Sequence, residues 1–145
     1  MERKLCQDWL DRVADCVFTG DVDTWTSHFS LPLSVLSDTE ASSVDTIEDL
    51  TEKFETWRRM FSSYGVTSMV RTVRDVIQGD EDRIVARYDT DLLAGGKRVM
   101  PRFASVMVLE RQGTRWRCTE VVTGIGATDR YLIHDTHPQG TRAAE

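Results

Sequence analysis

Residues 66–125 read VTSMVRTVRDVIQGDEDRIVARYDTDLLAGGKRVMPRFASVMVLERQGTRWRCTEVVTGI. Three short segments in this stretch have the composition of tight turns: Gly79-Asp80, Ala94-Gly95-Gly96-Lys97 and Gln112-Gly113-Thr114. Between them the stretch predicts long strands: Val66–Ile77, Arg83–Leu93, Arg98–Arg111 and Thr114–Ile125. We therefore expect a curved antiparallel sheet as the body of the protein.

Helical signals come before these strands. Apolar residues recur every three or four positions in 2–18 and again between Thr46, a predicted N-cap, and Gly65. Gly20 ends the first helix, and Asp21 caps a second, shorter one. A small hairpin is predicted between the second and third helices, with strands Leu33–Leu36 and Ala41–Val44. The order of elements predicts an α+β fold in which three N-terminal helices pack within a strongly curved sheet.

One predicted strand is apolar on both faces. Val99, Phe103, Met107 and Leu109 alternate along Arg98–Arg111 with Met100, Ala104, Val106 and Val108. In an antiparallel sheet with one solvent-exposed face, apolar and polar residues alternate along each strand. This strand does not alternate in that way, so both of its faces are expected to be covered. The helices can cover only one face. A second copy of the chain, in a two-fold homodimer, is the simplest cover for the other.

Composition limits the possible partners and surroundings. The net charge of −6 argues against nucleic acid, and no apolar run is long enough to span a membrane. The N-terminal residues lack the apolar core of a signal peptide, and the three cysteines form no CxxC motif. These features predict a cytoplasmic protein.

Charge is unevenly distributed between the two halves of the chain. Residues 1–64 carry 13 acidic and 6 basic side chains, and residues 65–145 carry 11 acidic and 12 basic ones. The halves could pack against each other, the arginines could serve an anionic ligand, or they could protect solvated strand edges.

Several segments together carry a resemblance to a known family. They are Gly20-Asp21 at the end of the first helix, Trp25–Leu33, Gly65-Val66, Arg102-Phe103-Ala104-Ser105 and Gly113–Cys118. In this pattern the chain resembles the NTF2-like superfamily and, within it, the SnoaL-like proteins. The resemblance implies a cone, residues 1–126, often dimeric through its convex sheet face and with a pocket at its open end. Residues 127–145 then form a polar tail.

The resemblance implies no specific reaction. Isomerase-like members carry a tyrosine on the first helix, where this chain has Trp9, and a base after the second helix, where Asp38 falls in a turn. Dehydratase-like members need paired tyrosines and histidines, and this chain offers only Tyr64, Tyr88 and Tyr131. Whether the protein is an enzyme at all stays open at this stage.

Five residues are candidates for lining a ligand pocket: His28, Tyr88, Arg102, Trp116 and Glu120. Each has a structural alternative. His28 could bond local backbone at a helix end, and Tyr88 could lie in the dimer interface. Arg102 and Glu120 could form an ion pair among the apolar neighbours of each strand, such as Trp116.

No metal or cofactor is expected. His134 and His137 are spaced for one helix face, but Pro138 makes a helix there unfavourable. Phosphate-binding and dinucleotide-binding glycine motifs are missing from the sequence, and Cys118 is expected to be a small buried residue. The leading hypothesis is a protein that binds a small, largely apolar molecule, with acid–base chemistry of the SnoaL-like kind as an extension. The alternative is a non-catalytic dimeric interaction or assembly module.

Overall fold

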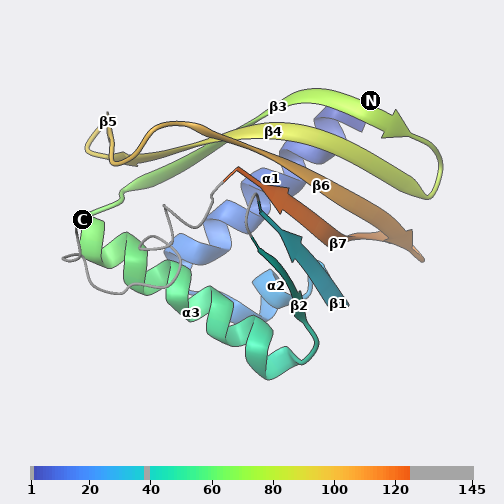
Figure 1. Ribbon diagram of the computed structural model, residues 1–145, viewed down its shortest axis with the longest axis horizontal. Helices are drawn as coiled ribbons and strands as arrows, with labels where there is room; N and C mark the ends of the chain where they lie inside the picture. The colour runs from blue at the N-terminus through green and yellow to red at the C-terminus, as the bar shows by residue number, and fades with distance from the viewer. Residues whose placement is uncertain (1, 38–39, 125–145) are drawn as a thin grey trace.

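The computed structural model describes residues 2–37 and 40–124 (Figure 1). Their elements are α1 (Glu2–Thr19), α2 (Val22–Thr26), β1 (Phe29–Leu36), β2 (Ala41–Val44), α3 (Ile47–Tyr64), β3 (Ser68–Gly79), β4 (Arg83–Ala94), β5 (Lys97–Arg98), β6 (Phe103–Gln112) and β7 (Arg115–Thr123). The predicted tail, with His134 and His137, lies outside the described residues, as do the tip of the predicted hairpin turn and Tyr131.

The helix ends lie where the sequence places them. The Asp21 carboxylate accepts a hydrogen bond from the backbone N–H of Thr24, and the Thr46 hydroxyl accepts one from that of Asp49. Each bond satisfies a donor that the first helical turn would leave unpaired. Gly65 ends α3 in the left-handed conformation, with φ of 66°, which a residue without a Cβ adopts at little cost.

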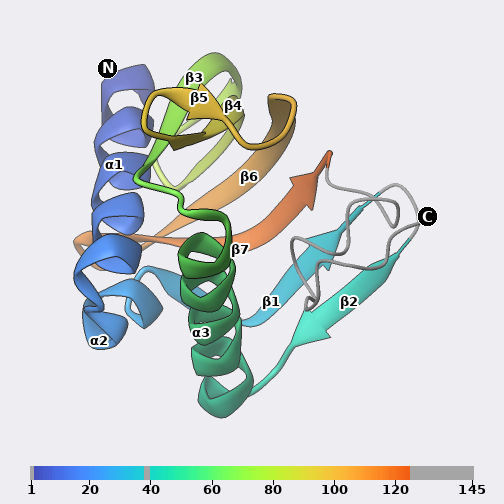
Figure 2. The ribbon, with the colours of Figure 1, turned by 90° about the vertical axis from the view of Figure 1, so that its left-hand side faces the viewer.

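The strands form one sheet of seven that curls around the helices (Figure 2). Its order is β2-β1-β7-β6-β4-β3, with β5 beside β4. The expectation of a strongly curved sheet with three helices is confirmed, but the sheet is mixed rather than antiparallel, because β1 runs parallel to β7. Alternation of apolar residues reports which face a side chain takes and carries no information on strand direction, so the sequence could not reveal this pairing.

The predicted strand Arg98–Arg111 is broken in two. β5 ends at Arg98 and β6 begins at Phe103, on either side of Pro101. Proline has no N–H to donate to a sheet, so the interruption falls where the ladder could not continue.

The concave face of the sheet supplies the core together with α1 and α3. The residues of β4 on this face are all buried: Ile84, Ala86, Tyr88, Thr90 and Leu92. All of these except Thr90 pack in one cluster with side chains of the helices such as Leu10, Val13 and Phe54. Helices and sheet thus enclose a single interior.

Helix α1 also covers the edge strand β3. The side-chain amide of Gln7 donates to the Arg71 carbonyl at 2.6 Å, and its oxygen accepts from the Val73 N–H at 3.0 Å. Arg3 donates to the carbonyls of Val73 and Arg74 at 2.8 and 3.0 Å. Main-chain groups of β3 that point away from β4 therefore have partners, and the backbone from the Arg71 carbonyl to Arg74 is held to α1.

The convex face carries apolar residues at its centre. Val108 is buried, Val106 is half-buried, and Val122, opposite Val106 on β7, is 37% exposed. This agrees with an apolar second face on β6, although the dimer that the sequence predicts through it remains a prediction.

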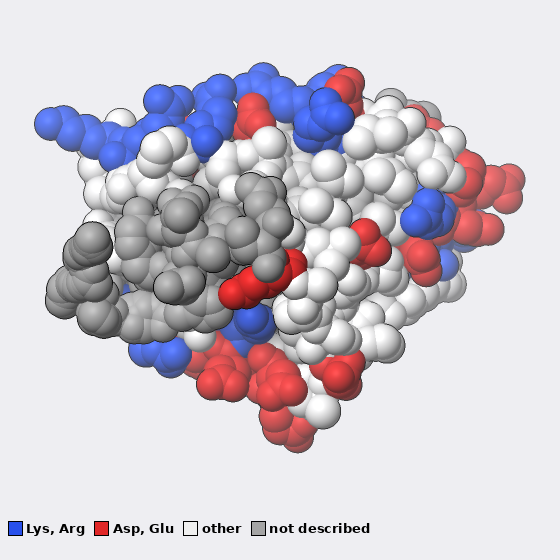
Figure 3. All heavy atoms as spheres, viewed as in Figure 1, with Lys and Arg blue, Asp and Glu red and all other residues white. Residues whose placement is uncertain are grey.

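Several arginines of the strand half pair with carboxylates of the same half. The ion pairs Arg74–Asp89, Arg87–Asp75 and Arg111–Asp82 have N–O distances of 2.7, 3.3 and 2.7 Å. Figure 3 shows basic side chains along the top, over β3 to β5, and acidic ones along the bottom. None of the described helices is long and apolar enough to cross a membrane.

Candidate functional site

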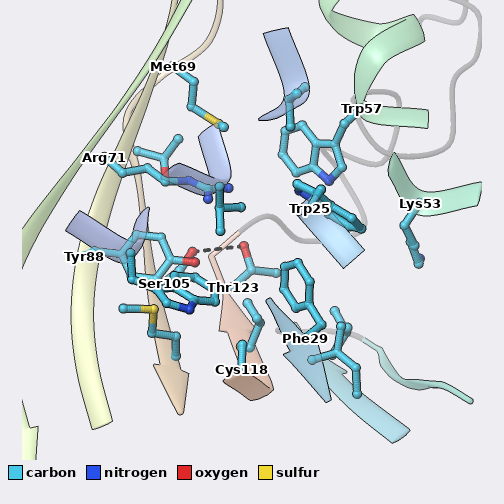
Figure 4. A pocket seen from close by; sticks show the side chains of 18 of the residues that line it. Trp25, Phe29, Lys53, Trp57, Met69, Arg71, Tyr88, Ser105, Cys118 and Thr123 are labelled. Atoms are coloured by element: carbon cyan, nitrogen blue, oxygen red, sulfur yellow. Dashed lines mark hydrogen bonds between the residues drawn. The ribbon is translucent and has the colours of Figure 1, made fainter. Parts of the chain in front are cut away.

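The cone encloses a cavity of about 150 Å³ between the concave face of the sheet and the helices. Figure 4 shows Trp25, Phe29 and Trp57 on one side of it. The Trp9 indole, also on its wall, donates its N–H to the Trp116 carbonyl at 3.1 Å. That bond satisfies the one polar group of Trp9, so these helices and β1 present a mainly aromatic wall.

The opposite wall is a polar stripe across four strands, formed by Arg71, Tyr88, Thr90, Ser105 and Thr123. Strand register brings them together. Arg71 on β3 lies opposite Thr90 on β4, while Tyr88, Ser105 and Thr123 occupy one row across β4, β6 and β7. The two rows are neighbours on the same face of the sheet, since residues two apart on a strand point the same way.

Arg71 is the charged member of this stripe. Its guanidinium extends into the cavity (Figure 4), with Cζ 5.7 Å from the centre of the Tyr88 ring. Nε of Arg71 is buried without a hydrogen-bond partner, and its side chain forms no ion pair within residues 2–37 and 40–124. The cation–π contact with Tyr88 offsets only part of the loss of hydration. Arg71 thus retains unused capacity to donate hydrogen bonds.

The row from Tyr88 to Thr123 supplies neutral hydroxyl groups. Burial raises the pKa of the Tyr88 phenol, so its hydroxyl stays protonated at neutral pH. Ser105 lies opposite Tyr88 and donates to the Thr123 hydroxyl at 3.3 Å. The hydroxyl of Thr90 is buried and has no partner among the described residues. This wall can offer hydrogen bonds but no negative charge.

Of the five predicted pocket residues, Tyr88 lines the cavity and the other four do not belong to its wall. His28 is buried beside it, with Nδ1 2.8 Å from the Thr24 carbonyl and its ring in edge contact with Trp9 at 5.6 Å. A carbonyl only accepts, so Nδ1 carries a proton in this contact. Burial lowers the pKa of His28, which keeps the ring neutral.

The predicted ion pair between Arg102 and Glu120 does not form. Arg102 instead pairs with Asp91 at 3.0 Å, and Arg98 donates to the same carboxylate at 2.8 Å. Hydrogen bonds from Arg102 and Arg98 lower the pKa of Asp91. Arg102 lies before β6 begins, and Glu120 lies opposite Val108, well along that strand.

A bulge in β7 explains the placement of Glu120. Cys118 pairs with Leu109, but Glu120 pairs with Val108, so Thr119 is an extra residue that reverses the faces beyond it. Cys118 therefore lies inside and Glu120 outside, whereas uninterrupted alternation along the strand would put them on one face. Trp116, before the bulge, is half-buried and contributes its carbonyl to the bond with Trp9.

The wall offers limited chemistry. Its titratable side chains are Lys53, Arg71, Tyr88 and Cys118, and no Asp, Glu or His of the described residues lines the cavity. Burial raises the pKa of Cys118 to about 12, so this thiol is a poor nucleophile at neutral pH. Residues 2–37 and 40–124 also contain no cluster of His, Cys, Asp and Glu that could hold a metal ion.

Sequence reasoning missed Arg71, Ser105 and Thr123. A signal for Arg71 exists in the alternation of β3. Met69 and Val73 face the core, and Arg71, midway between them, must face it too. Ser105 likewise falls between Phe103 and Met107. A polar residue on the apolar face of a strand is the pattern that finds both.

The comparisons with known proteins agree with this fold. The family described as NTF2-like protein (DUF6841) matches residues 2–124. No curated protein matches the sequence.

Solved structures resemble the chain at low sequence identity. An NTF2-like protein of unknown function from Shewanella oneidensis MR-1 is 12% identical, with 86% of this chain and 99% of that chain covered and a TM-score of 0.65. An NTF2-like protein with a cystatin-like fold from Novosphingobium aromaticivorans is 12% identical, with 92% and 89% covered and a TM-score of 0.62. Another protein from that organism, provisionally described as an aromatic ring hydroxylase, is 16% identical, with 85% and 88% covered and a TM-score of 0.61. Identities this low establish the fold alone.

Proposed function

This chain belongs to the NTF2-like family DUF6841, and we propose that it binds a small, largely apolar molecule in the cavity of its cone. The observation that carries the proposal is the cavity itself, which has aromatic side chains on one wall and a polar stripe on the other. Binding sites for small molecules commonly combine an apolar lining with a few placed polar groups.

The cavity volume limits the size of the ligand. Pockets for drug-sized molecules measure about 300–1,000 Å³, whereas an apolar cavity of about 150 Å³ can bind benzene. At about 150 Å³, this cavity suits a compound with one ring and a small substituent. Trp25, Phe29 and Trp57 offer ring faces and edges for aromatic contacts with it.

The lining favours binding over acid–base catalysis. General acid–base chemistry of the SnoaL-like kind needs a group that exchanges a proton near neutral pH. The described wall has no carboxylate or imidazole, and its phenol, Tyr88, has a raised pKa. Tyr88 would therefore act by donating a hydrogen bond to a ligand oxygen. A catalytic role would depend on hydrogen-bond donors such as Tyr88, Thr90 and Arg71 within the described wall.

The alternative, a dimeric interaction module, draws on the convex face. Val106 and Val122 lie side by side there; Val106 is half-buried and Val122 is exposed. The two functions use opposite faces of the sheet, so a dimer through the convex face is compatible with a ligand in the cone. Both the dimer and a cytoplasmic location are predictions from the sequence.

Titration with toluene, followed by NMR of the backbone amides, tests the proposal. We expect shifts concentrated around the aromatic wall at Trp25, Phe29 and Trp57, with the amides of Asp82 and Gly113 in exposed turns as internal controls. Naphthalene, which has two fused rings, should bind more weakly because it exceeds the volume. If neither toluene nor a monocyclic compound with one polar substituent moves the amides around the cavity, the proposed function is wrong.

A further inference from the structure

We propose that the ligand of this cavity carries a carboxylate, and that Arg71 binds it through its guanidinium. The inference rests on the proposed function and narrows it to monocyclic carboxylates. Its basis is the position and bonding of Arg71, which the sequence did not single out.

Arg71 lacks the acidic partner that Arg74 and Arg87 have. Arg117 on β7 also has a buried, unpaired Nε, but it does not line the cavity. Arg74, three residues along β3, donates to Asp89 at 2.7 Å, and Arg87 on β4 pairs with Asp75 at 3.3 Å. Arg71 faces the cavity instead, with Nε buried and unpaired. A buried donor without an acceptor destabilises a fold, so an acceptor supplied by a ligand would recover that free energy.

The surroundings of Arg71 match a carboxylate in charge. The cavity wall contains a second cation, Lys53 on α3, and no described acid. Lys53 also lines a groove outside the cavity with Ser42 and Glu52, so it lies where the cavity meets the surface. The charged side chains of the cavity wall itself are therefore both cationic, although the groove outside also contains Asp49 and Glu52, and the wall favours a bound anion over a bound cation.

The surroundings also match in shape. A guanidinium presents parallel N–H groups that can bind both oxygens of a carboxylate. Contact with the Tyr88 ring fixes the orientation of the side chain, and the backbone of Arg71 is held by Gln7. Thr90, opposite Arg71 on β4, has an unpaired hydroxyl that can donate to the same oxygens. The ring of the ligand would then face the aromatic wall.

Binding of benzoate and benzamide to the full chain tests the inference. The two probes are nearly identical in shape, but only benzoate is charged. We expect benzoate to bind about tenfold or more tightly than benzamide, because truncating one partner of a desolvated charge pair has effects of this size or larger. Isothermal titration calorimetry measures both affinities. The Arg71 Nε–H resonance in NMR, assigned by its loss in Arg71→Gln, should shift only with benzoate.

Variants of neighbouring arginines give the matched control. Arg71→Gln should abolish the preference for benzoate, and Arg71→Lys should keep part of it, since a lysine retains charge without the planar fork. Arg74→Gln removes a charge from the same strand, on a side chain paired with Asp89, and should leave the preference intact. The amide spectrum of each variant shows whether it is folded. If Arg71→Gln does not fold, loss of the resonance in Arg71→Lys assigns it instead, and the Nε–H shift of the wild-type protein still decides the matter.

The results separate the two proposals. Equal binding of toluene, benzamide and benzoate, with no shift of Arg71 Nε–H, overturns the carboxylate inference and leaves an apolar binding site. A benzoate preference that Arg74→Gln removes as fully as Arg71→Gln also overturns it, because general surface charge would then be the cause. Failure of all three compounds to bind overturns the proposed function together with the inference.

Discussion

Acid should destabilise this protein through His28. The imidazole is buried, and its pKa is lowered, first by burial and then by the positive charges of Arg12, Arg115 and Arg117, against an opposing contribution from the Thr24 carbonyl. A lowered folded-state pKa means that the unfolded chain binds the proton more readily. The contribution of neutral His28 is therefore intact above pH 6.5, the ordinary pKa, and falls as the pH drops from there toward the lower folded-state value.

The size of the effect has an upper limit. A histidine that stayed wholly neutral in the folded state would lower the free energy of unfolding by about 1.4 kcal/mol between pH 7.5 and 5.5. The bond to Thr24 favours the protonated ring, and solvent screens the nearby arginines, so we expect about 0.5–1 kcal/mol.

Urea unfolding followed by tryptophan fluorescence measures this difference. The comparison is with His28→Asn, whose side-chain amide can still donate to the Thr24 carbonyl but does not titrate. Carboxylates titrate equally in both proteins, so the wild type should lose about 0.5–1 kcal/mol more than the variant between the two pH values. Equal losses, or a His28 pKa of 6.5 or higher by NMR titration, would refute the reasoning.

Other predictions concern the core, the thiols and the convex face. Phe54→Ala should lower the free energy of unfolding by about 3–5 kcal/mol, and exposed Ile47→Ala by about 0.5 kcal/mol or less, in chemical denaturation; similar losses would contradict the packing. Cys118 should resist iodoacetamide at pH 8 until the protein unfolds, as peptide mass spectrometry can follow, and rapid native labelling would contradict its burial. Val106→Glu should convert the expected dimer to monomer in light scattering, whereas a monomeric wild-type protein would exclude that dimer.

Local sequence signals predicted most of the fold. Thr46 and Gly65 act as caps within their own helix, and the alternation along β4 depends only on the strand itself. These interactions join residues close in sequence, so a single sequence contains the information. The break at Pro101 is also a local signal, although the predicted strand Arg98–Arg111 continues through it.

Long-range pairing could not be predicted in the same way. The parallel contact of β1 with β7 joins segments more than 80 residues apart, such as Phe29 and Cys118. The extra residue Thr119 reverses the faces of β7, and no turn residue marks it. The candidate site depends on such pairings, because Arg71 and Tyr88 come together only through the register of β3 and β4.

The bonds of α1 to β3 have a consequence for assembly. An open strand edge can take up a peptide or the edge of another sheet as an additional strand. Along β3, Arg3 and Gln7 already occupy the main-chain groups of Arg71 and Val73 that such a strand would need. Gln7 also holds the backbone of the proposed anion-binding arginine. Loss of the Gln7 amide would therefore expose part of the β3 edge to pairing with another strand. It would also loosen the backbone of Arg71, so that protection against aggregation and ligand binding depend on the same side chain.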